Sequence, residues 1–126
     1  MTSGQPHLLM VYNSDGGLFA MVSDAVHKVV SPRTYPCSLC AITYGAVSMK
    51  LEWRRYLERL PAQVTFHHRD DFAGAWPEAR FALPAILIEN DGCLSELVSA
   101  RDLDSIVTVA ELTALVDARL AQVQRV

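Results

Sequence analysis

The sequence lacks the features of membrane-spanning, secreted and nucleic-acid-binding proteins. No apolar run approaches the roughly eighteen residues needed to cross a bilayer. Residues 1–7 contain neither a basic segment nor an apolar core of signal-peptide length. Basic residues are scattered, with no run longer than Arg54-Arg55, and the formal net charge is -3, so no phosphate-binding stripe is indicated. We therefore expect a cytoplasmic protein without nucleic-acid or membrane partners.

Cysteine is also scarce, and the chain contains only Cys37, Cys40 and Cys93. In the cytosol, so few cysteines are more naturally thiols, metal ligands or a transient redox pair than a structural disulfide framework. No second Cys-x-x-Cys pair stands at zinc-finger spacing, and the Gly-Lys phosphate loop of nucleotide hydrolases is absent. We expect no bound cofactor and assign no metal ligand.

What the sequence does contain is the composition of an ordinary globular protein. Hydrophobic residues make up 51% and charged residues 20% of the 126 residues, which fits one domain with a core of its own. The hydrophobic periodicity predicts alternating strands and helices, with at most a short helix within 70–81. We expect strands over 8–12, 63–68, 84–89 and 93–99, and helices over 17–30, 48–60 and 108–122.

Short motifs mark the ends of several elements. Asn90-Asp91-Gly92 is a strong signal for a tight turn between antiparallel strands. Thr108 and Glu111 have the spacing of a capping box that opens the last helix. Ser48 is the expected cap of the second helix, and Pro84 begins a strand, where a missing N–H donor is tolerated. The order of elements predicts an α/β fold with parallel strands and one antiparallel hairpin.

The second half of the chain resembles the thioredoxin superfamily. The segment 82–92, which reads Ala-Leu-Pro-Ala-Ile-Leu-Ile-Glu-Asn-Asp-Gly, is similar to the cis-proline, third strand and glycine turn of that family. The resemblance covers roughly residues 8–30 and 62–122. It implies a thioredoxin-like mixed sheet of about four strands flanked by helices, in a single domain over 1–126, with 31–47 as an inserted loop and short helix. It also implies that Pro84 is a cis-proline that shapes a substrate groove.

The position of the cysteines departs from that family. Redox-active members place Cys-x-x-Cys directly after the first strand, where this chain reads Asn13-Ser14-Asp15-Gly16-Gly17. The motif Cys37-Ser38-Leu39-Cys40 lies about twenty residues further on. Both helices that flank 31–47 are expected to run away from the same edge of the sheet, so this segment must return the chain to that edge. At a maximum of ~3.3 Å per residue it is long enough to do so. The two cysteines can therefore approach Pro84, although the sequence does not require it.

The leading hypothesis is thiol-disulfide chemistry at Cys37 and Cys40. A cysteine at a helix N-terminus is favoured as the thiolate, and Pro36 suits the first turn of a short helix over 37–43. Cys37 then attacks a disulfide of an unknown protein or small-thiol partner, and Cys40 resolves the mixed disulfide. The expected substrate-binding residues are Pro84, Asn13, Ser14 and Asp15.

Two alternatives for the cysteines remain open. Cys37 and Cys40 are also half of a tetrahedral zinc site, which His67-His68 or Cys93 would complete. In the second alternative, Cys37 and Cys40 are small residues that pack within a loop. In either case the chain would be a non-catalytic thioredoxin-like module that binds a partner through Pro84 and the surface over 13–17.

The remaining chemistry-bearing residues have structural interpretations. Cys93 is expected in the core, as are Trp53 and Tyr56, which stand at helical spacing. His67 and His68 are expected on opposite faces of a strand, and Asp70-Asp71 in a loop or a helix cap.

Overall fold

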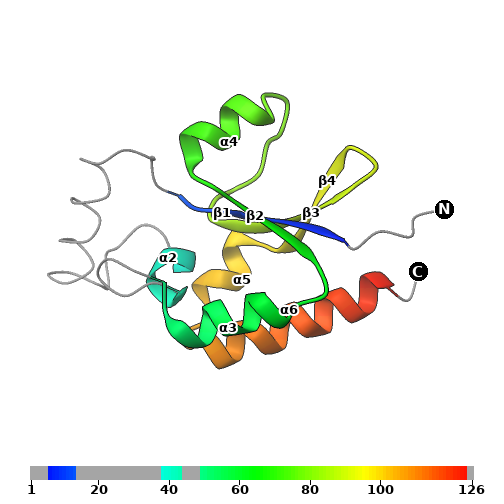
Figure 1. Ribbon diagram of the computed structural model, residues 1–126. Helices are drawn as coiled ribbons and strands as arrows, with labels where there is room; N and C mark the ends of the chain where they lie inside the picture. Colours follow the sequence, from blue (N-terminus) through cyan, green and yellow to red (C-terminus); the bar gives the residue numbers. More distant parts are fainter. Residues whose placement is uncertain (1–5, 14–37, 44–48, 125–126) are drawn as a thin grey trace, which may run out of the picture.

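The protein is an α/β structure with a four-stranded mixed sheet flanked by helices (Figure 1). The computed structural model describes residues 6–13, 38–43 and 49–124, without the side chains of residues 38, 40, 41 and 124. The helix expected over 17–30 and most of the segment 31–47 lie outside the described residues. The elements are β1 (His7–Val11), α2 (Ser38–Thr43), α3 (Leu51–Arg59), β2 (Gln63–His67), α4 (Arg69–Ala75), β3 (Ala85–Asn90), β4 (Cys93–Val98), α5 (Ala100–Asp104) and α6 (Val109–Gln124).

The strands lie in the order β2-β1-β3-β4. β1 pairs in parallel with β2 and antiparallel with β3, and β4 pairs antiparallel with β3, so β4 runs in the same direction as β1. In Figure 1, α4 covers one face of the sheet, and α3 and α6 lie side by side across the other. The described chain thus forms three layers, with the sheet in the middle.

β1 is one of the two inner strands of the sheet, and its apolar run is buried on both faces. Leu8 and Met10 belong to the larger core, which faces α3 and α6, whereas Leu9 and Val11 belong to the smaller core, which faces α4. Successive side chains of a strand point to opposite faces, so a strand between two layers needs apolar residues throughout. The strand expected over 8–12 is thus confirmed as β1, and the structure buries it on both faces.

The larger core is built mostly from helices. Trp53 of α3 and Leu112 of α6 are fully buried against the sheet, and α2 and α5 contribute Leu39 and Leu103. Four of the described helices thus share one face of the sheet.

Among the described helices, only α4 contributes to the smaller core. Phe72 is the buried residue of α4, and it packs on Leu9 and Leu87 of the sheet. Partly buried residues of the segment 76–83 complete this layer.

Several sequence predictions are confirmed at the residue level. The turn between β3 and β4 contains Asp91 and Gly92 with positive φ angles of 54° and 82°. The capping box of α6 is formed, since the Glu111 N–H donates to Thr108 Oγ1 and the Thr108 N–H donates to Glu111 Oε1. The Leu83–Pro84 peptide bond is cis, as the resemblance implied.

Two local predictions are wrong, and one helix was not predicted. α3 begins at Leu51 with Lys50 as its N-cap, not Ser48, because the Lys50 N–H donates to the carbonyl of Thr43 at the end of α2. Cys93 is exposed rather than buried, because it opens an edge strand beside the hairpin turn. α5 was not expected at all, although Ser99 and Asp102 form a capping box at its start.

Candidate functional site

The candidate site lies at one edge of the sheet. This edge is formed by the carboxyl ends of the parallel strands β1 and β2, not by an outer strand. Val11 pairs with His67 on one side and with Ala85 on the other, so the residues just beyond this pairing meet at the same edge. The Tyr12 N–H continues the ladder to the carbonyl of His67 at 2.9 Å. Carboxyl ends of strands are the usual place for sites in α/β sheets, because loops rather than paired strands follow there.

Two of the four expected substrate-binding residues can be placed at this edge. Pro84 directly precedes β3, is buried, and follows the cis peptide bond. Asn13 follows Tyr12, and its Oδ1 accepts a hydrogen bond from Arg69 Nη1 at 3.4 Å. Ser14 and Asp15 lie outside the described residues.

α2 lies at the same edge as Pro84. β4 runs in the direction of β1 and ends at this edge, α5 follows it after Ser99, and α2 packs against α5. Buried Leu39 and Ile42 hold α2 in the larger core. Figure 1 shows α2 near the end of the sheet that lies farthest from the N-terminal label. The expected return of the chain to this edge is therefore observed for α2.

The cysteines themselves are placed only in part. Cys40 lies within α2, and Cys37 directly precedes its first residue, Ser38. Cys37 and the side chain of Cys40 are outside the described part of the chain, so their pairing stays a prediction.

His67 and Asp71 form an ion-pair geometry at this edge that the sequence analysis missed. The His67 Nδ1 lies 2.9 Å from Asp71 Oδ2, and the ring packs edge-on against Phe72 with 5.9 Å between centroids. Asp71 also accepts the backbone N–H of His68, the N-cap of α4, so the expected cap role of an Asp70-Asp71 residue is confirmed. The spacing of four residues was the available signal for this pair.

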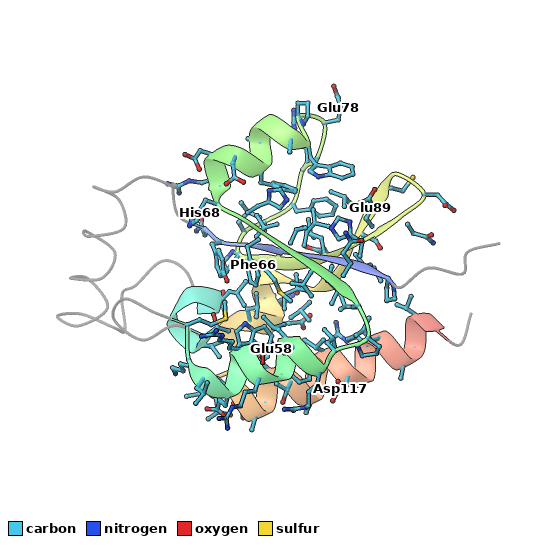
Figure 2. All side chains as sticks on the ribbon, viewed as in Figure 1. Glu58, Phe66, His68, Glu78, Glu89 and Asp117 are labelled. Carbon is cyan, nitrogen blue, oxygen red and sulfur yellow. The ribbon has the colours of Figure 1, made fainter. Side chains whose placement is uncertain are left out.

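Aromatic rings occupy the other face of this edge. Tyr12 stacks on Phe66 with 6.3 Å between centroids and an interplanar angle of 8°, and the His68 ring lies 5.8 Å from Tyr12. Phe66 is 43% exposed. In Figure 2, Phe66 and His68 lie toward the end of the sheet where α2 is drawn.

The zinc alternative gains no ligand set from the described residues. Cys93 pairs with Asn90 at the opposite edge of the sheet, and the six residues of β4 separate it from the α2 edge by roughly 17 Å. Within the described ranges, no group of three or more histidine, cysteine or acidic side chains could hold a metal ion.

No protein-family model, curated protein or solved structure matches this chain. The helices in the described part of the chain are too short or too polar to span a membrane.

Proposed function

We propose that the chain is a thioredoxin-like thiol-disulfide protein that uses Cys37 and Cys40. The strand order β2-β1-β3-β4, with one parallel and two antiparallel pairings, supports this proposal. The helices support it as well, because α3 and the C-terminal α6 share one face of the sheet while α4 covers the other.

The position of α2 is the observation that carries the redox part of the proposal. This helix starts directly after Cys37, contains Cys40, and packs against α5 at the edge where Pro84 and Asn13 lie. An inserted segment would therefore deliver its Cys-x-x-Cys motif to the edge that also holds the proposed substrate surface.

The proposed reaction exchanges two electrons between this pair and a partner disulfide. The Cys37 thiolate attacks one sulfur of the partner disulfide, which forms a mixed disulfide and releases the partner's other sulfur as a thiolate. The Cys40 thiolate then attacks the Cys37 sulfur and releases the second partner thiolate. The pair ends as a disulfide, the partner as a dithiol, and a small thiol such as glutathione returns the pair to the reduced form.

The test is a thiol titration of the native Cys93→Ser variant across a glutathione redox series. Cys93 is exposed and would otherwise react on its own. We expect the two remaining thiols to disappear together at one potential, and the added Cys40→Ser change to trap one glutathione on Cys37. The matched Cys37→Ser variant should trap none. Thiols that react independently, or only after denaturation, would contradict the proposal and leave a non-catalytic binding module.

A further inference from the structure

A groove with a positive lining runs along the seam between α3 and α6. Its volume is about 720 Å³, and Lys50, Arg55 and Arg59 of the α3 side line it. Glu52 is the acid among its lining residues. The lining is therefore cationic in a chain whose formal net charge is -3.

The three cations have no ion-pair partner among the described residues. Their neighbour Arg54 differs, because its Nε lies 3.7 Å from Glu58 Oε2. Cations that are held on one face without internal partners leave their charge available to a ligand.

Asp117, an acid on the α6 side of the seam, is already engaged. The Tyr56 hydroxyl donates to Asp117 Oδ1 at 2.6 Å and joins the two helices. Burial, and then the hydrogen bond to Asp117, raise the pKa of Tyr56 far above its usual value, so this hydroxyl remains a donor at physiological pH. The groove wall is thereby held in place without using the three cations.

The spacing of the cations favours an extended ligand over a compact anion. At 1.5 Å per residue, Lys50 and Arg59 stand roughly 14 Å apart along the helix axis, with Arg55 between them. A single phosphate would need cations that converge on one point. Carboxylates four residues apart on a helix are separated by about 6 Å along its axis, and those on alternate residues of an extended peptide by about 7 Å. Neighbouring cations of the groove have similar spacings, about 6–8 Å along the helix axis.

The groove also offers apolar contacts. Val109 and the Tyr56 ring lie in its wall, and Leu51 at its rim is 57% exposed. A ligand that alternates acidic and apolar side chains would satisfy both kinds of surface.

We propose that the groove between α3 and α6 binds an acidic peptide segment of a partner protein. Its carboxylates face Lys50, Arg55 and Arg59, and an apolar side chain covers Leu51. The proposal is independent of the cysteine chemistry, because no lining residue of the groove is a cysteine. Binding through exposed charges is salt-dependent.

The experiment measures fluorescence anisotropy of a labelled peptide of alternating Glu and Leu, about ten residues long, at low salt. The double variant R55E/R59E is compared with R54E/R101E, which changes the net charge equally at exposed arginines outside the groove lining. We expect R55E/R59E to weaken binding at least about tenfold and R54E/R101E to weaken it less than about twofold. Circular dichroism melts confirm that both variants fold.

Three outcomes would overturn the proposal. Equal losses in the two double variants would mean that only net charge attracts the peptide. Inorganic polyphosphate that competes at lower concentration than the peptide, with the same dependence on Arg55 and Arg59, would assign the groove to a phosphate ligand. Self-association of the wild type that R55E/R59E abolishes would assign it to a second copy of this chain.

Discussion

At the scale of single residues, Asp102 connects three elements. Its Oδ2 accepts the backbone N–H of Ser99 and the Nη1 of Arg119, each at 3.1 Å, and the same Arg119 nitrogen donates to the carbonyl of Leu97 at 2.8 Å. β4, α5 and α6 are therefore joined by one carboxylate and one guanidinium. The Ser99 backbone hydrogen bond, helped by Arg119, lowers the pKa of Asp102.

This lowered pKa makes part of the stability pH-dependent. A carboxyl whose pKa is lower in the folded than in the unfolded chain stabilises the fold above the unfolded value, about 4, and loses that contribution as the pH falls through the folded value. We expect Asp102→Asn to lower the free energy of unfolding by about 1–2 kcal/mol at pH 7. The difference from the wild type should shrink steadily below about pH 4.

Urea unfolding at pH 7, 5 and 3 measures this difference. Asp104→Asn is the matched control, because Asp104 is an exposed carboxylate of the same helix. If Asp102→Asn lowers the free energy of unfolding by the same amount at all three pH values, the charge of Asp102 is not the cause.

At the scale of elements, two glycines have opposite conformational roles. Gly92 of the hairpin turn has a φ of 82°, whereas Gly74 lies inside α4 without a positive φ. An added Cβ would contact nothing within 4 Å at either position, so backbone conformation alone decides the effect.

We expect Gly92→Ala to destabilise the protein by about 1–2 kcal/mol, because a residue with a Cβ disfavours the left-handed region. Gly74→Ala should stabilise it by about 0.4–1 kcal/mol, because alanine restricts the unfolded chain and favours the helix. Thermal unfolding of the two variants gives the sign of each change in stability directly. Equal signs would contradict the assigned turn geometry or the helix.

Elements that carry their own signal were predictable from the sequence. The apolar run of β1, the Asp91-Gly92 turn and the Thr108 cap each specify structure within a few residues. α5 was not predicted, because a helix of five residues with one buried side chain, Leu103, is too short to show hydrophobic periodicity. The first residue of α3 was predicted wrongly, because a contact with α2 and not Ser48 determines where the helix begins.

The candidate site was predictable to a similar degree. The strand order brings Pro84 and Asn13 to one edge. Pro84 was predicted as a site residue from the resemblance of segment 82–92 to a family cis-proline. His67 and Asp71 were not paired in advance, because their contact depends on how α4 turns away from β2. A position at the start of a strand predicts Cys93 in the core, but that position does not distinguish an outer strand from an inner one.

At the scale of the whole molecule, the described helices cover the two faces of the sheet unequally. Four helices contribute buried residues to the larger core, but α4 contributes only Phe72 to the smaller one. Regions with few buried apolar contacts open at lower free energy than the rest of a protein. Of the two described helical layers, the α4 layer is therefore expected to open first.

Native-state hydrogen exchange tests this order. We expect amides of α4 to exchange at least about tenfold faster than those of β1, which corresponds to about 1.4 kcal/mol. α3 is the control, since it is also short but buries Trp53 and Tyr56 in the larger core. Protection of α4 equal to that of β1 would contradict a difference between the two layers.

The inner position of β1 has a consequence for synthesis on the ribosome. The side-chain contact between His7 and Glu89 joins residues 82 positions apart, and the contact between His7 and Thr65 spans 58. β1 is therefore synthesised well before either neighbouring strand. During that interval its apolar residues lack their strand partners in the sheet. Pairings of such separation are slow to form, and exposed apolar strands attract chaperones and other chains in the meantime. Of the four described strands, the one that the finished fold buries most completely is thus also synthesised longest before its neighbours in the sheet.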